Sequence, residues 1–301
     1  MVKGAKPIMA FKKNATIGSK MFDIFNYLLI TLITLATVFP LINFLSLSLS
    51  SSRAISSGEV FILPVEVNFG AYINLIKDGT LVKALKNSVV VAGCGTALNM
   101  VATILGAYPL SKKRLRGRGI LLGLITFTMM FGGGLIPTFI LIKQLNLIDS
   151  YWSLWLLGLI STYNMLVLKS FFEQLPPDLE ESAAIDGFND FSILVRIILP
   201  ISMPAIATIT LFYLVSHWNS YFNVMMYISD SNKQTVMTRL MQMIDKLKTS
   251  LLDSSELQIE MAAPESVKAA AVVFSTLPIL CVYPFLQRYF VKGVMIGAIK
   301  S

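Results

Sequence analysis

Carboxylates, prolines and a glycine are grouped in one stretch of the chain, at about residues 172–200. Small side chains at Ser182, Ala183 and Ala184 leave room there for another protein to approach closely. The stretch lies between two apolar segments and holds one basic residue, Arg196, with the acids Glu173, Asp178, Glu180, Glu181, Asp186 and Asp190. We therefore expect this stretch to dock against a partner.

The order of these residues predicts a helix, a turn and a second helix. Pro176 and Pro177 suit a helix start, because the N–H that proline lacks would be unpaired there in any case. Acids in the first turn interact favourably with the helix dipole. Gly187 supplies the left-handed residue that ends a helix, and Asn189 or Asp190 can cap the next helix. We expect this second helix to stop at Pro200.

The sequence lacks the motifs of an enzyme. It contains no G-x-x-x-x-G-K-[ST] loop, so we do not expect this chain to cradle ATP phosphates. His217 is the only histidine, and no nucleophile–histidine pair or metal-ligand cluster is visible. Cys94 and Cys281 fall inside apolar runs, where a buried cysteine acts as a small hydrophobe. We predict neither catalysis nor a cofactor, metal or disulfide in this chain.

Several polar residues interrupt the apolar segments. Polar groups inside a membrane usually face the bundle interior or a cavity. Aromatic faces with hydrogen-bonding neighbours also suit a sugar, whereas aromatic residues equally form belts at the membrane interface. The candidates are either packing residues or the lining of a substrate pathway: Asn99, Asn164, Trp218, Asn219 and Tyr221.

The composition places these features in a membrane protein. Hydrophobic residues make up 55% and charged residues 14% of the chain, against about 45–50% and about 25% in soluble domains. A helix needs about 20 apolar residues to cross the hydrocarbon core. We predict an all-α protein with six transmembrane helices, at about residues 25–47, 89–110, 120–142, 152–171, 203–228 and 269–290.

Basic residues predict the orientation. The net charge is +8, and Lys and Arg gather in the tail 1–24, in the link SKKRLRGR after Leu110 and in the tail 291–301. Clustering between apolar segments argues against nucleic-acid binding and places these parts in the cytoplasm. The first span is too long for a signal peptide, so we expect it to be retained. The loops 48–86 and 229–268 then lie outside, as solvated surfaces or, for 229–268, a docking surface.

The acidic stretch resembles the EAA signature of bacterial binding-protein-dependent permeases, which is E-A-A, three residues, G, nine residues and I-x-L-P. This chain has Glu181, Ser182 and Ala183, then Gly187, then Ile197, Leu199 and Pro200 at that spacing. Ser182 replaces the first alanine and is also small. Stretches that resemble permeases of complex-oligosaccharide importers begin at Phe131, Trp218 and Gln287.

The resemblance implies a type I importer permease of the ATP-binding-cassette (ABC) class, with its permease domain at 87–290. In that family the short helix is a coupling helix that seats on an ATPase, a role carried over to Glu181, Ser182, Ala183, Asp186 and Gly187. The implied partners are a second homologous permease, two cytoplasmic ATPase subunits that hold ATP and Mg, an extracytoplasmic sugar-binding protein, membrane lipid and an oligosaccharide. The implied location is the bacterial cell membrane.

Two alternatives stay open. A permease of the same fold can carry a peptide or a polyamine, and sequence does not separate it from a sugar permease. A secondary transporter should show an intramembrane carboxylate or a repeat between halves, and a membrane enzyme should show a polar catalytic cluster. We see neither feature in this sequence.

Overall fold

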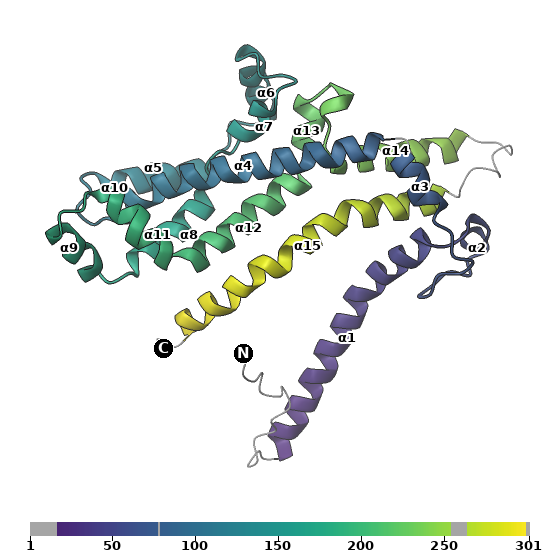
Figure 1. Ribbon diagram of the computed structural model, residues 1–301, viewed down its shortest axis with the longest axis horizontal. Helices are drawn as coiled ribbons and strands as arrows, with labels where there is room; N and C mark the ends of the chain where they lie inside the picture. Colours follow the sequence, from purple (N-terminus) through teal and green to yellow (C-terminus); the bar gives the residue numbers. More distant parts are fainter. Residues whose placement is uncertain (1–16, 78, 254–263, 299–301) are drawn as a thin grey trace. The chain divides into compact units, whose positions relative to one another are not determined.

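The computed structural model describes residues 17–77, 79–253 and 264–298 (Figure 1). The chain is 78% helical and has no strand within these ranges, which confirms the all-α prediction. The elements in chain order are α1 (Ile17–Ser48), α2 (Ser52–Ser56), α3 (Gly70–Lys77), α4 (Thr80–Ser111), α5 (Arg118–Met130), α6 (Leu135–Gln144), α7 (Tyr151–Leu156), α8 (Thr162–Glu173), α9 (Asp178–Ile185), α10 (Asp190–Ile193), a π-helix (Leu194–Ile198), α11 (Leu199–Ile201), α12 (Met203–Asn219), α13 (Phe222–Tyr227), a 3-10 turn (Ser231–Lys233), α14 (Val236–Asp253) and α15 (Pro264–Ala298).

The chain divides into two compact units. The first comprises residues 1–71 and 260–270, and the second comprises residues 72–259 and 271–301. In the first unit α1 is followed by a small cap around α2, whose core is formed by Ala54, Ile55 and Val60. The second unit contains the acidic stretch and is built around α4.

Helix α4 packs mainly against α12 and α8 (Figure 1). Its buried face carries mostly small or polar side chains at helical spacing, among them Ala92, Gly95, Thr96, Asn99 and Thr103. Small residues allow close helix approach in membranes, where apolar surface alone does not drive helices together. A Cβ at Gly95 would lie 2.6 Å from the Nε2 of His217 on α12, so this crossing needs a glycine.

The third and fourth predicted spans are not continuous helices. The segment 120–142 is divided into α5 and α6, which meet at 108° across the glycines that follow Phe131. The segment 152–171 is divided into α7 and α8, because Gly158 adopts a left-handed φ of +85° that a helix cannot continue. Periodicity could not predict these two breaks, since apolar residues continue through both. The fifth predicted span, 203–228, is also divided, into α12 and α13.

Three described helices are individually long and apolar enough to cross a membrane: α1, α4 and α15. Two bent pairs of helices also pass this test when each pair is taken as one span. One pair is α5 with α6, and the other is Asp190–Ile201 with α12, which meet at 84°. The predicted loop 229–268 contains helix α14, and its acids Glu256 and Glu260 lie outside the described residues. Within the chain alone both cysteines are free and exposed, contrary to the expectation of burial.

Candidate functional site: the acidic stretch between α8 and α12

Helix α9 begins and ends as its sequence predicts. Pro177 is the N-cap, and three acids occupy the first turn. At the other end Gly187 has a φ of +84°, its N–H donates to the carbonyl of Ala184 at 3.1 Å, and the N–H of Phe188 donates to the carbonyl of Ala183 at 3.0 Å. This pair of bonds is a Schellman motif, which fixes the exit direction of the chain and confirms the predicted left-handed turn.

The two faces of α9 differ. Ala183 is 4% exposed and belongs to the core of the second unit, and Phe188 packs against the same core. The small Ala183 therefore lets α9 approach its own bundle, which corrects the expectation that it leaves room for another protein. Glu181, Ser182 and Asp186 are exposed. Ile185 is 87% exposed and extends this outer face with an apolar side chain.

The segment after the turn differs from the prediction at its end. The side chain of Asn189 accepts a bond from the N–H of Ser192 at 2.8 Å, which confirms the predicted cap of α10. The helix does not stop at Pro200 but continues to Ile201. A π-helical turn at Leu194–Ile198 ends two residues before Pro200, and the sharp bend follows at Ser202. The π-turn changes the hydrogen-bond register just where proline removes a donor.

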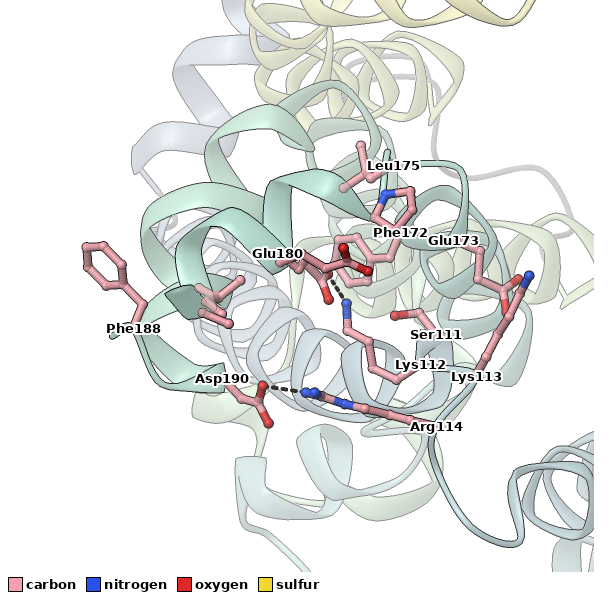
Figure 2. A pocket seen from close by; sticks show the side chains of 14 residues that line it. Ser111, Lys112, Lys113, Arg114, Phe172, Glu173, Leu175, Glu180, Phe188 and Asp190 are labelled. Carbon is pink, nitrogen blue, oxygen red and sulfur yellow. Dashed lines mark hydrogen bonds and ion pairs between the residues drawn. The ribbon is translucent and has the colours of Figure 1, made fainter. Parts of the chain in front are cut away.

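Ion pairs join the acidic stretch to the basic link after α4. Lys112 pairs with Glu180, and Arg114 pairs with Asp190 at 2.5 Å (Figure 2). Arg118 pairs with Glu173, which also contacts Lys169 at 2.8 Å. From the sequence the basic link is expected only to determine topology. The signal for these pairs was the opposite net charge of two segments that are predicted to share one membrane face.

A cavity of about 430 Å³ lies between the link and α9 (Figure 2). Its walls include Lys113 from the link, Glu181 from α9 and Ile193 from α10. The ammonium of Lys112 also lies 4.2 Å from the ring centre of Tyr108, a cation–π distance. The charged groups therefore connect the acidic stretch to the end of α4 and to the link that follows it.

Three of the five predicted pathway residues are buried inside the chain. Asn99 is 1% exposed, and its amide donates to the carbonyls of Gly158 and Leu159 at 2.9 and 2.8 Å. Its oxygen pairs with His217 Nε2 at 2.7 Å. Asn99 thus supplies hydrogen bonds to two carbonyls of the non-helical backbone between α7 and α8. Non-helical backbone is tolerated at membrane depth only when its polar groups are bonded in this way.

The other four pathway candidates separate into two groups. Asn164 is buried on α8, and the indole of Trp218 is buried and donates to the carbonyl of Ser275 at 3.2 Å. Asn219 is exposed at the end of α12, and Tyr221 is half-buried before α13. Only this second group has surface that a substrate could reach in this conformation.

Residues 17–77, 79–253 and 264–298 contain no grouping of three His, Cys, Asp or Glu side chains that could hold a metal ion. The candidate site consists of the exposed face of α9, which the core and the ion pairs hold from behind.

Comparison with known proteins places this geometry in a family. The family described as "Binding-protein-dependent transport system inner membrane component" matches residues 99–296, which include the acidic stretch. The chain is 40% identical to the polygalacturonan/rhamnogalacturonan transport system permease protein YtcP of Bacillus subtilis strain 168, over 94% of this chain and 99% of that protein.

Solved structures agree with this match. A chain from a bacterial ABC transporter involved in the import of the acidic polysaccharide alginate superposes with a TM-score of 0.83 at 32% identity, covering 92% of this chain and 99% of that one. A chain from an alginate ABC transporter in complex with an alginate pentasaccharide-bound periplasmic protein shares the fold alone, with a TM-score of 0.57 at 15% identity over 89% and 94% of the two chains. The chain belongs to the binding-protein-dependent transport system inner membrane components, a family of transport subunits and not of enzymes.

Proposed function

We propose that this chain is one of two homologous permease subunits of an ATP-driven importer of oligosaccharides. The observation that carries the proposal is the acidic stretch, in which α9 is fixed to the bundle on one face and exposed on the other. A partner that pushes on Glu181, Ile185 or Asp186 moves the core residues behind them, because packed interiors transmit displacement with little compression. We assign that partner to a cytoplasmic ATPase.

The substrate class follows from the relatives. The names of two relatives that cover more than nine tenths of this chain specify a polygalacturonan/rhamnogalacturonan transport system and alginate import. We propose that this chain passes oligosaccharides larger than a disaccharide. Asn219 and Tyr221 offer an amide and an aromatic ring with accessible surface, and we assign them to the pathway.

The remaining subunits follow from the same proposal. ATP and Mg bind to the ATPase pair, and an extracytoplasmic binding protein delivers the sugar to the two permeases. The chain then lies in the bacterial cell membrane with both termini in the cytoplasm. Transport occurs by alternating access of the two permeases, driven by closure of the ATPases.

The test is affinity purification of the full chain from its own membranes in mild detergent, with mass spectrometry of the proteins that co-purify. We expect an ATPase, a second permease of the same family and a binding protein. The recovered binding protein is then titrated with oligosaccharides, monosaccharides, peptides and polyamines by calorimetry. Reproducible recovery of the chain alone would contradict the importer, and heat released only by monosaccharides or non-sugars would contradict the substrate class.

A further inference from the structure

The cap of the first unit displays an apolar segment. Val60–Val65 carries no charge and is bounded by Glu59 and Glu66. Val60 is buried in the small core of the cap, but the next three side chains turn outward and are large and apolar. Their exposed fractions are 66% for Phe61, 54% for Ile62 and 75% for Leu63. Three consecutive exposed side chains of this kind are a surface that water does not favour.

Two side chains near the C-terminal end of α1 and one just beyond it bond backbone groups of this segment. Asn43, Ser46 and Ser50 follow one another at helical spacing. The amide of Asn43 donates to the carbonyl of Phe61 at 2.7 Å, and the hydroxyl of Ser46 donates to the carbonyl of Ile62. The hydroxyl of Ser50 accepts from the N–H of Val65 at 3.0 Å. Three backbone groups of the segment are therefore bonded to side chains at the end of α1 and just beyond it, while the side chains of Phe61, Ile62 and Leu63 are exposed.

The position of these bonds along α1 determines how deep in the bilayer they lie. No charged residue occurs between Asp23 and Arg53. A hydrocarbon core about 30 Å thick takes up about 20 helical residues. Counted from the charge at Asp23, this thickness ends close to Asn43 and Ser46. Phe61 and Ile62, which are bonded to these two residues, then lie at the boundary between acyl chains and headgroups.

We infer that Phe61–Leu63 is a membrane anchor, inserted into the leaflet that the C-terminal end of α1 reaches. Irregular backbone is excluded from the hydrocarbon unless its polar groups are bonded within the protein, and Asn43 and Ser46 bond the two deepest carbonyls of the segment, those of Phe61 and Ile62. Arg53 and Glu66 of the cap form an ion pair at 3.8 Å and are both exposed. The anchor fixes the axial position of α1 in the bilayer.

The test measures depth with nitroxide labels on single cysteines in a background of Cys94→Ser and Cys281→Ser. Labels are placed at Phe61→Cys and Leu63→Cys, with Ser57→Cys on the same cap as the aqueous control and Leu32→Cys within α1 as the lipid reference. The full chain, with the subunits that co-purify, is reconstituted into vesicles of phosphatidylethanolamine and phosphatidylglycerol. Power saturation compares collisions with oxygen and with a water-soluble nickel chelate.

We expect labels at positions 61 and 63 to collide more with oxygen than with nickel, as at position 32, and the label at position 57 to show the reverse. Nickel preference at positions 61 and 63 would overturn the anchor, as would protection from both reagents, which would indicate a covering protein. Adding Asn43→Leu removes the side-chain amide that donates to the carbonyl of Phe61, and should shift position 63 toward the ratio at position 57. An unchanged ratio would overturn the role assigned to Asn43.

Discussion

Gly187 is the residue on which the exit of the chain from α9 depends. Its φ of +84° and its bond to Ala184 both exclude proline, whose φ is held near about −65° and which has no N–H. A left-handed conformation costs a residue with a side chain about 1–2 kcal/mol, which corresponds to about a 5–30-fold change in an equilibrium.

We therefore expect Gly187→Pro to abolish ATP-driven uptake in proteoliposomes while the chain still inserts into the membrane, and Gly187→Ala to have a smaller effect. Gly79→Pro is the matched control, because Gly79 is also left-handed but caps α4 away from the acidic stretch. Full uptake by Gly187→Pro would count against a coupling role for α9.

Lys112 and Glu180 form a partly buried ion pair between the basic link and α9. Exposed pairs contribute about 0.2–1 kcal/mol, and removing one partner of a shielded pair leaves a charge without its counterion. We expect Lys112→Glu to lower the uptake obtained per ATP hydrolysed, and the double variant with Glu180→Lys to recover most of it. Uptake and phosphate release are measured together in the reconstituted complex.

The matched control for this pair is Arg53→Glu, whose partner Glu66 is at 3.8 Å on an exposed surface. It should leave the ratio of uptake to hydrolysis unchanged. Equal loss in the single and double variants would show that the two charges act separately and that the pair does not brace α9.

At the scale of the elements, the break between α7 and α8 is held by another helix. Asn99 of α4 accounts for two backbone carbonyls of the break, so its loss leaves buried acceptors without donors. Each such group costs about 1–3 kcal/mol. We expect Asn99→Leu to lower the thermal unfolding temperature of the purified chain in detergent, measured by a tryptophan fluorescence melt.

Asn219→Leu is the control for this prediction, because Asn219 is exposed at the end of α12. Its unfolding temperature should stay near that of the unaltered chain, while uptake at low substrate concentration falls if it lines the pathway. A larger fall in the unfolding temperature for Asn219→Leu than for Asn99→Leu would contradict the placements of both residues.

The elements also show how much of the fold and of the candidate site can be predicted from sequence alone. The caps around α9, the turn at Gly187 and the apolar segments follow from local spacing and were predicted. The bend after Phe131 was not, because a glycine run suits close packing and open backbone equally. A Cβ at Gly132 or Gly133 would meet nothing within 4 Å in this chain, so these glycines do not serve close packing between its own helices. The partners of Lys112 and Asn99 depend on contacts far apart in sequence, which no local pattern contains.

At the scale of the whole molecule, the orientation is a prediction from the basic residues. The link after α4 carries five bases and is bonded to the acidic stretch, so both must be on the same side of the membrane. We expect a fluorescent protein fused after Ser301 to fluoresce and an alkaline phosphatase fused there to be inactive. A cytoplasmic C-terminus gives this result, and active phosphatase would reverse the topology.

The ion pairs between the link and the acidic stretch have a consequence for recombination between related permeases. A chimaera that receives only residues 172–200 from a relative keeps the native Lys112, Arg114 and Arg118 but exchanges the acids that face them. Such a graft changes the charge match and the fit against the core together. The two segments therefore need to be exchanged together. We expect grafts that transfer residues 111–118 with 172–200 to give more uptake per ATP hydrolysed than grafts of either segment alone.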